Sequence, residues 1–373
     1  MKIRTLDTRN SRDVHSFVEF PFKLYRQSKQ WVPSLVSEVE MAMNRDRHPF
    51  YKHSEADFLV VESEKDILGQ VAVIHNRNYC AHHKIETAFI YYFDIANDLQ
   101  AAKQLLNAVI GWARDHGIVK ILGPKGFLRA NGLGVLVDGF DYLPAVGIPY
   151  NFPYYASFLE DSGFVKETDH FSGYIERTSK LPERLYEVAE KVKIRGNFWI
   201  KTFKDKEEMR TWIPKVEVVH NEAFSIHPWY YPSTEAEFEM IAGSMIQIAQ
   251  PGLMKLIMKG EEVAGFIISY PDISEGIQKS RGRMFPFGWA YLLNSINTSK
   301  TVDMNGLGIL PKYQGLGSNA LLYTEVEKTL RDSRFERLEI VQVDERNFKS
   351  KADMDTIGTI WHKLHRSYRY LIN

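Results

Sequence analysis

The sequence has a single cysteine, Cys80, among its 373 residues. One cysteine excludes an intramolecular disulfide framework and a metal site built from several thiolates. No segment reaches the roughly 20 apolar residues that a membrane-spanning helix needs, and the N-terminal segment lacks the apolar core of a signal peptide. We therefore expect no disulfide, no metal and no transmembrane segment, and a reduced, cytoplasmic setting in which contact with the inner membrane is at most peripheral.

The sequence also lacks an excess of charge of either sign. Lys and Arg total 47 and Asp and Glu total 47, which gives a formal net charge of zero. Proteins that act mainly on nucleic-acid phosphates usually carry a basic excess, so we expect no nucleic-acid partner. Apolar residues make up 44% of the chain. The length suits two domains, each with its own core.

One stretch, residues 302–331, predicts a strand, a tight turn and a helix. Residues 302–310 form the strand, Pro311 ends it, and the apolar residues of the following segment recur at helical spacing. Gly315 and Gly317 allow a sharp turn that leaves the first helical N–H groups free. Such amides, at the positive end of a helix dipole, favour a diphosphate. The alternative is an ordinary strand-to-helix turn.

The same order of elements occurs twice along the chain, which indicates an internal duplication. Each half reads as strand, two helices, hairpin, strand, helix and strand. In the first half the elements are predicted at residues 3–6, 11–25, 34–43, 58–62, 70–75, 89–93, 99–116 and 120–122. In the second they are predicted at residues 200–203, 209–223, 234–248, 254–258, 263–270, 302–310, 318–331 and 337–343.

The duplication predicts domains at residues 1–178 and 196–373, joined by a linker helix at residues 179–195. The two copies differ at the strand-to-helix turn. In the first copy the turn, residues 93–99, has no glycine and carries Asp94 and Asp98. Carboxylates at a helix start cap it well but repel a diphosphate. We therefore expect the first domain to be a scaffold and acceptor wall, without a nucleotide site.

This element order, together with residues 309–318 (ILPKYQGLGS), resembles the GNAT superfamily of acyl-CoA N-acyltransferases. The resemblance implies an α/β fold of two tandem GNAT domains, each a mixed, mostly antiparallel sheet flanked by helices. It also implies acetyl-CoA or a longer acyl-CoA as co-substrate and a primary amine as acceptor. Lys312 stands where the family usually has Arg or Gln. The implied cofactor-binding residues are Leu307, Gly308, Ile309, Lys312, Gln314, Gly315, Leu316, Gly317, Ser318 and Asn319.

A narrower resemblance, to a bacterial group of tandem-GNAT proteins, covers nearly the whole chain. Some members of that group are bacterial ceramide synthases, so the resemblance implies a long-chain lipid amine such as a sphingoid base as acceptor. Two other classes stay open: a non-catalytic acyl-CoA-binding protein, and a transferase that uses aminoacyl-tRNA. The segments that carry this resemblance are residues 20–25, 31–33, 48–51, 123–124, 136–140, 149–155 and 221–224.

Acyl transfer from a thioester to an amine needs oxyanion donors, a base for the ammonium proton and an acid for the leaving thiolate. Backbone N–H groups of residues 306–309 are the implied donors. Asp303, Glu222 and His220 are the candidate bases.

The family often places the acid on a Tyr of the last helix, where this sequence has Met354 and Asp355. Tyr155 reaching across from the first half, His362, or water are the remaining candidates for the acid. Residues 271–300 are an insert in which Lys279, Arg281 and Arg283 precede an aromatic and apolar run. The insert suits a lid over an acyl chain or a shallow membrane contact. Alternatively, it is a strand and helix that fill space.

Overall fold

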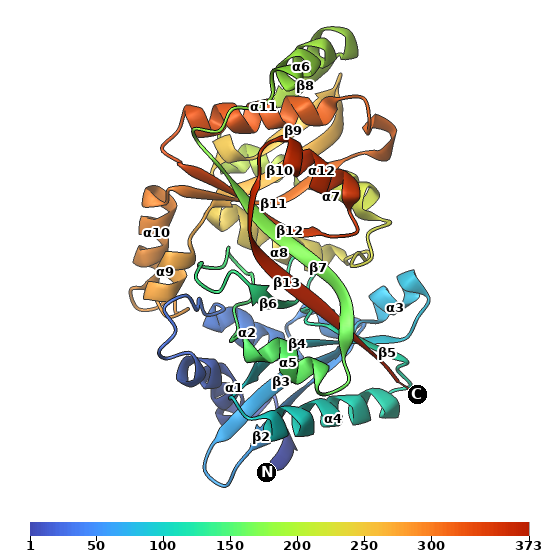
Figure 1. Ribbon diagram of the computed structural model, residues 1–373, viewed down its shortest axis with the longest axis vertical. Coiled ribbons are helices and arrows are strands. Elements are labelled where there is room, and N and C mark those ends of the chain that lie inside the picture. The colour runs from blue at the N-terminus through green and yellow to red at the C-terminus, as the bar shows by residue number, and fades with distance from the viewer. Residues whose placement is uncertain (373) are drawn as a thin grey trace. The chain divides into compact units, whose positions relative to one another are not determined.

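The computed structural model describes residues 1–372, which divide into two compact units (Figure 1). The first unit contains Met1–His170, Ser274–Leu293 and the described residues from Lys363 onward. The second contains Phe171–Ile273 and Asn294–His362. The units are discontinuous in sequence, whereas the predicted domains are continuous. The difference arises because part of the insert and the end of the C-terminal strand belong to the first unit.

The first unit is built on a sheet with the strand order β1-β2-β3-β4-β5-β13, and β6 pairs with β13. Strands β1 to β4 pair antiparallel, whereas β4 and β5 are parallel. The elements are β1 (Lys2–Thr5), α1 (Ser11–Leu24), α2 (Val36–Met43), β2 (Glu55–Glu62), β3 (Ile67–His75), α3 (Arg77–His83), β4 (Thr87–Ile95), α4 (Leu99–Asp115), β5 (Lys120–Gly123), β6 (Val135–Asp138), α5 (Tyr154–Glu160), the start of β7 (Val165–Glu176), α9 (Ser274–Lys279), the first half of α10 (Gly288–Thr298) and the end of β13 (Ile360–Leu371).

The second unit has the strand order β7-β12-β11-β10-β9-β8, in which β11 and β12 are parallel. Its elements are the rest of β7, α6 (Glu183–Gly196), β8 (Phe198–Lys201), α7 (Lys206–Phe224), α8 (Glu235–Ile248), β9 (Lys255–Lys259), β10 (Glu262–Pro271), the rest of α10, β11 (Thr301–Ile309), α11 (Ser318–Arg331), β12 (Arg337–Asp344), α12 (Phe348–Thr356) and the start of β13. Short 3-10 turns lie in the first unit at Pro49–Lys52 (η1) and in the second at Pro251–Leu253 (η2) and Pro311–Tyr313 (η3). The predicted mixed, mostly antiparallel α/β fold is confirmed.

Each unit buries its core between a sheet and amphipathic helices. In the first, α4 packs across β2 and β3 (Figure 1), and its residues Leu105, Leu106 and Val109 recur at helical spacing and are fully buried. In the second, α11 and α6 lie side by side and contribute to one core cluster, while α7 contributes to another. No helix within residues 1–372 is both long and apolar enough to cross a bilayer.

Most predicted elements are present within a few residues of the predicted bounds, because their apolar periodicity is strong. Helices α3 and α5 and strands β6, β7 and β13 were not predicted. α3, α5 and β6 are short, and seven or four residues give too few turns or alternations for a periodic pattern to stand out. β7 and β13 have twelve residues each, but they contain many polar and charged residues and no clear apolar alternation. The insert forms two helices, α9 and α10, instead of the strand and helix that were one of its predicted alternatives.

The turn that follows β4 in the first unit is closed by tyrosine side chains. Tyr155 is fully buried. Its hydroxyl oxygen accepts a hydrogen bond from the Ile95 N–H at 2.9 Å and forms another with the Tyr25 hydroxyl at 2.7 Å. The Tyr154 hydroxyl donates to the Ile95 carbonyl at 2.8 Å. Tyr25 also donates to Asp94 Oδ1 at 2.9 Å, and burial raises the pKa of Asp94 to about 6. The backbone at the end of β4 is therefore occupied by side chains of its own unit.

We expect Tyr155→Phe to lower the free energy of unfolding by about 1–3 kcal/mol, because it leaves the buried Ile95 N–H without its acceptor. Urea denaturation followed by circular dichroism measures the change. Tyr150→Phe is the matched control, since the Tyr150 hydroxyl makes only a 3.3 Å bond to Phe140 O in a partly buried position. Equal stability of Tyr155→Phe and wild type would contradict this structural role.

Candidate active site

Strand β11 separates from its parallel neighbour β12 partway along its length. The two strands pair from Thr301 and Arg337 to Met304 and Ile340, whereas β11 continues to Ile309. Over that remainder β11 pairs with β10 on its other edge. The backbone of residues 305–309 is thus available along the edge that faces away from β10, which is where an extended ligand can pair with a strand.

The direction of the individual N–H groups follows from the antiparallel ladder. The Leu310 N–H donates to Ala264 O of the β10 edge at 2.9 Å. Because backbone groups alternate sides along a strand, Gly308 also faces β10, and Leu307 and Ile309 face the open edge. The Ile309 carbonyl there accepts from Gln314 Nε2 at 3.0 Å. Of the predicted donors, Leu307 and Ile309 therefore have the suitable orientation.

A bulge lies at the point where the strands part. Ile268 faces Gly306 and Ser269 faces Met304, so Asn305 is an extra residue in β11. Gly308 has a different explanation, because a Cβ there would lie 2.9 Å from the Phe266 ring and 3.2 Å from Phe224 Cε2. The structure thus supports the predicted opening of the strand, and Gly308 is small because aromatic side chains pack against it.

The turn between β11 and α11 is exposed and tightly curved. Gly315 has φ +76° and Gly317 has φ +82°, a conformation that other residues adopt only with strain. Gly317 is the N-cap of α11 and has no side chain with which to cap the helix. In the first unit, by contrast, the Asp98 carboxylate accepts from both Gln100 N and Ala101 N at the start of α4. At the start of α11 the Ala320 N–H donates to Gly317 O at 3.0 Å and to Asn319 Oδ1 at 3.1 Å, so the N–H groups of Ser318 and Asn319 are the ones left for another acceptor.

The other predicted residues of the turn have side chains that hold the turn together. Buried Ser318 donates from Oγ to Tyr313 O at 3.2 Å, and Asn319 Nδ2 donates to Asp353 Oδ2 at 2.8 Å. These two residues can offer backbone N–H groups, but their side chains are engaged. The Leu316 side chain is exposed.

Lys312 forms an ion pair in this structure. Its Nζ lies 2.6 Å from Glu262 Oε1, and the Tyr313 hydroxyl donates to Glu262 Oε2 at 2.6 Å. The hydrogen bond from Lys312, followed by that from Tyr313, lowers the pKa of Glu262. Both partners of the ion pair are about half exposed, so water screens it and a diphosphate can compete for Lys312.

The predicted linker helix, α6, flanks this turn. A Cβ on Gly317 would lie 2.6 Å from Val188 Cγ1 and 3.2 Å from Val192 Cγ2. Further along α11, the Tyr186 hydroxyl donates to Glu327 Oε1 at 2.5 Å. The helix therefore belongs to the second unit and fixes the position of the α11 N-terminus.

A row of buried polar side chains crosses the sheet of the second unit. Asp303 of β11 is the register partner of Tyr270 on one side and of Glu339 on the other. Glu339 Oε1 lies 2.9 Å from His362 Nε2, and both side chains are almost fully buried. Asn305 Nδ2 donates to the Tyr270 hydroxyl at 2.5 Å. Burial, and then the Asp303 charge, raises the pKa of Tyr270.

Among the members of this row, Asp303 was predicted as a base and His362 as an alternative acid, whereas Glu339 and Tyr270 were missed. A signal existed for Glu339, because it stands between Leu338 and Ile340 in a predicted strand, where a carboxylate is out of place. The partner that makes it informative, Asp303, is 36 residues away in sequence and becomes its neighbour only through parallel pairing.

The remaining candidate bases lie on α7. The His220 ring stacks on Phe266, with centroids 5.8 Å apart and an interplanar angle of 9°, and also contacts Phe224. Glu222 is exposed, and its charge contributes to the raised pKa of Lys312, after the hydrogen bond and charge of Glu262. Tyr155 lies in the first unit, where its hydroxyl is bonded as described above. The site roles of these residues stay predictions.

No protein-family model matches the chain. The chain is 26% identical over 380 residues to Protein YghO of Escherichia coli (strain K12), a match that covers 96% of this chain and 93% of that protein. It is 24% identical over 378 residues to Bacterial ceramide synthase of Caulobacter vibrioides (strain NA1000 / CB15N), with 98% and 97% covered.

Solved structures show the same architecture. A tandem GNAT protein from the clavulanic acid biosynthesis pathway aligns with a TM-score of 0.58 at 11% identity, covering 100% of this chain and 98% of that one. A GCN5-related N-acetyltransferase from Sphaerobacter thermophilus aligns with a TM-score of 0.52 at 14% identity, covering 100% and 96%. This chain therefore has the tandem GNAT fold that its element order predicts.

Proposed function

We propose that this protein is an acyl-CoA-dependent N-acyltransferase whose second unit holds the thioester and moves its acyl group to a primary amine. The observation that carries the proposal is the meeting of two features at one end of β11. These are the unpaired strand edge at residues 305–309 and the uncapped N-terminus of α11. The first suits the amide-containing arm of coenzyme A, and the second suits its diphosphate.

The proposed chemistry uses groups of the second unit. The N–H of Leu307 or Ile309 would stabilise the oxyanion that forms on the thioester carbonyl. Asp303, buried beside Glu339, would take the proton from the attacking ammonium group. We assign no step to Tyr155, because its hydroxyl already binds Tyr25 and Ile95. His362 or water remains to protonate the thiolate.

The lipid acceptor rests on two supports. One is the name of the Caulobacter relative, Bacterial ceramide synthase. The name describes that protein and not this chain, but it makes a sphingoid base the first acceptor to test. The other is an exposed apolar run that leads into α10, in which Phe285 is 85% and Phe287 is 71% exposed. Trp289, Tyr291 and Leu293 continue this run. Such a run suits contact with an acyl chain or a bilayer surface, without crossing it.

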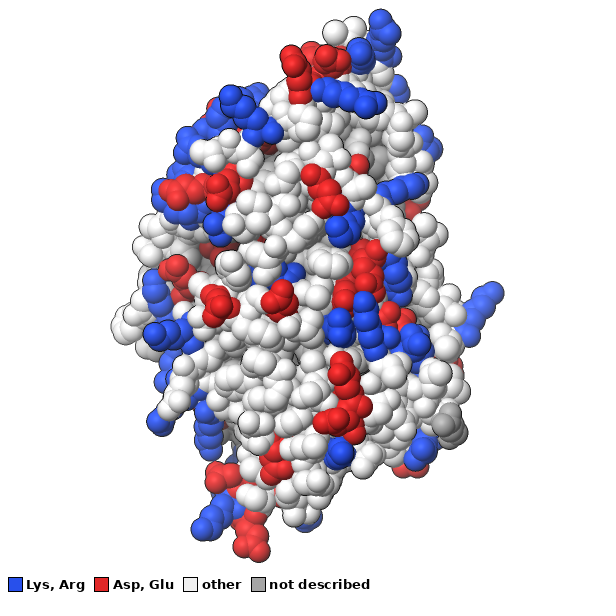
Figure 2. All heavy atoms as spheres, viewed as in Figure 1, with Lys and Arg blue, Asp and Glu red and all other residues white. Residues whose placement is uncertain are grey.

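One basic residue of the insert is engaged, because Arg283 pairs with Glu19. Lys279 pairs with Glu275 at 3.1 Å, but both side chains are more than half exposed, so water screens this pair and Lys279 stays available. The exposed aromatic side chains and Lys279 therefore carry the proposed contact. An aminoacyl-tRNA donor is disfavoured, because Lys and Arg are interspersed with Asp and Glu on the face drawn in Figure 2, and the net charge is zero.

Gly315→Glu is expected to abolish coenzyme A binding, measured by isothermal titration calorimetry. The new carboxylate would stand at the turn and repel the diphosphate. Gly358→Glu is the matched control, because Gly358 has φ +81°, open space around a Cβ and a place outside the turn. Both variants carry the same backbone strain and charge. Unchanged affinity in Gly315→Glu, or equal loss in the control, would remove the proposed diphosphate site.

Asp303→Asn is expected to lower kcat by about a hundredfold or more while coenzyme A affinity stays at the wild-type value, because the change removes only a proton acceptor. Steady-state kinetics and calorimetry measure the two quantities. Glu339→Gln is the comparison that separates the two carboxylates of the row. A wild-type kcat in Asp303→Asn would assign the base elsewhere.

An acceptor screen tests the reaction itself. We expect mass spectrometry to detect an amide after incubation of the protein with palmitoyl-CoA and a sphingoid base presented in lipid vesicles, with Asp303→Asn as the inactive control. Product with short polar amines alone would discard the lipid acceptor and keep the transferase. Coenzyme A binding without any amide would instead establish a non-catalytic acyl-CoA-binding protein.

A further inference from the structure

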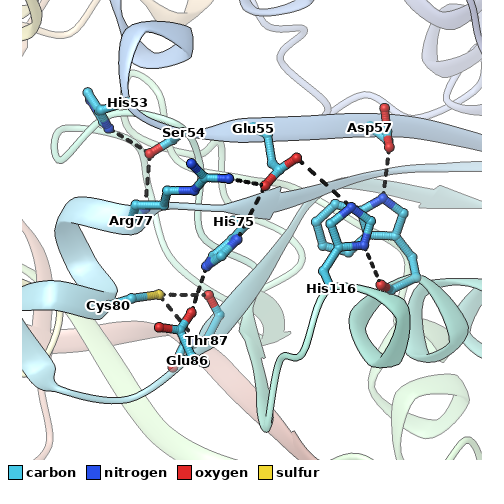
Figure 3. Close-up of polar contacts among 11 residues, drawn as sticks. His53, Ser54, Glu55, Asp57, His75, Arg77, Cys80, Glu86, Thr87 and His116 are labelled. Atoms are coloured by element: carbon cyan, nitrogen blue, oxygen red, sulfur yellow. Dashed lines mark hydrogen bonds and ion pairs between the residues drawn. The ribbon is translucent and has the colours of Figure 1, made fainter.

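A cluster of three potential metal ligands lies in the first unit, on the connection from β3 through α3 to β4 (Figure 3). His75 is the last residue of β3, Cys80 lies within α3, and Glu86 directly precedes β4. One donor atom from each, a ring nitrogen, the sulfur and a carboxylate oxygen, lies within 4.8 Å of the other two. The prediction of no metal rested on the single cysteine, which excludes a site with several thiolates but not this mixed set of donors.

The three side chains already contact one another or share a neighbour. His75 Nε2 lies 2.9 Å from Glu86 Oε2. The Thr87 N–H donates to Cys80 Sγ at 3.3 Å, and the thiol donates to the Thr87 carbonyl at 3.4 Å. Burial raises the pKa of the Cys80 thiol, and the Thr87 N–H aimed at the sulfur opposes part of that rise. His75 and Cys80 are buried while the Glu86 side chain is 55% exposed, so an ion can reach the cluster from solvent.

A second carboxylate lies near the other ring nitrogen of the histidine. Figure 3 shows Glu55 beside His75, and its Oε1 lies 3.6 Å from His75 Nδ1, on the side of the ring opposite Glu86 and just beyond hydrogen-bond distance. Arg77 holds Glu55 through a 2.8 Å contact to the same oxygen. A carboxylate behind a metal-binding imidazole is the usual arrangement around zinc, and a small movement would bring Glu55 into that position.

We propose that His75 Nε2, Cys80 Sγ and the Glu86 carboxylate bind one divalent zinc ion. A nitrogen, a sulfur and an oxygen donor suit zinc, whereas magnesium and calcium prefer oxygen ligands alone. Donors around tetrahedral zinc lie about 3.3–3.8 Å apart, given bonds of about 2.0–2.3 Å. His75 Nε2 and Glu86 Oε2, now 2.9 Å apart, must separate slightly to admit the ion, and the exposed Glu86 side chain can make that movement. Three protein ligands leave the fourth position to water or a small anion.

Zinc binding displaces the Cys80 thiol proton and the proton shared by His75 and Glu86, so the ion replaces an existing hydrogen-bonded cluster. The three ligands come from the end of one strand, a short helix and the start of the next strand. The ion would therefore fasten α3 to the sheet edge. This role is independent of the proposed acyl transfer, which uses residues of the second unit.

The test uses the full chain, stripped with a chelator and then titrated with Zn²⁺ in competition with a chromophoric chelator. We expect one ion per chain, and more than tenfold weaker binding in Cys80→Ser and in Glu86→Gln. His82→Gln, an exposed histidine change in the same helix, is the matched control and should bind zinc as wild type does. Saturating zinc should also raise the Tm of wild type, but not of Cys80→Ser.

A cobalt spectrum makes the result independent of how well the variants fold. Wild-type protein loaded with Co²⁺ should show a thiolate-to-cobalt charge-transfer band, because Cys80 is the only thiol in the chain. The absence of this band, or zinc affinity in Cys80→Ser equal to that of wild type, would overturn the proposal. In that case the cluster is a hydrogen-bonded part of the core and holds no metal.

Discussion

The separation of β11 from β12 after Met304 is the feature on which the candidate site depends. A buried strand must pair its backbone groups, and here β10 supports β11 along one edge while the other edge is left open. The bulge at Asn305 lies where the strands part, and the glycine turn then places the uncapped start of α11 just beyond the open edge. The open strand edge, with the N–H groups of Leu307 and Ile309, and the start of α11 thus offer two groups of backbone donors at the same end of β11.

The first unit has the same construction and uses it differently. Its strands β4 and β5 also pair only at their beginning, from Thr87 to Phe89, and the Lys125 N–H then donates to Ile90 O. Tyr154 and Tyr155 bind both backbone groups of Ile95, and Asp98 caps α4. The positions that stay open in the second unit are thus filled by side chains in the first. This difference explains why a duplicated fold offers one candidate nucleotide site.

The buried polar row supplies the chemical groups that the backbone cannot. Burial of Asp303 and Glu339 on adjacent strands is costly unless they share protons or partners, and His362 is one such partner for Glu339. Polar groups held in this way in an apolar sheet are typical of functional sites rather than of cores. In the first unit, the Tyr25, Tyr155 and Asp94 cluster satisfies its members internally. Each unit thus has a cluster of buried polar side chains. The cluster stabilises the structure in the first unit and supports the proposed chemistry in the second.

The sequence by itself determined the elements with strong apolar periodicity, their duplicated order and the contrast between the two turns, because apolar periodicity, glycine and capping residues act over a few neighbouring positions. It therefore predicted the tandem fold and the glycine turn. Only the tertiary structure decided which backbone groups of β11 face the open edge, that Glu339 stands beside Asp303, that Lys312 is held by Glu262, and that part of the insert belongs to the first unit. These facts depend on strand register and on contacts between residues far apart in the chain, which local patterns do not encode. The cluster of His75, Cys80 and Glu86 is the intermediate case, since its residues are close in sequence but only the fold of β3, α3 and β4 brings their donor atoms together.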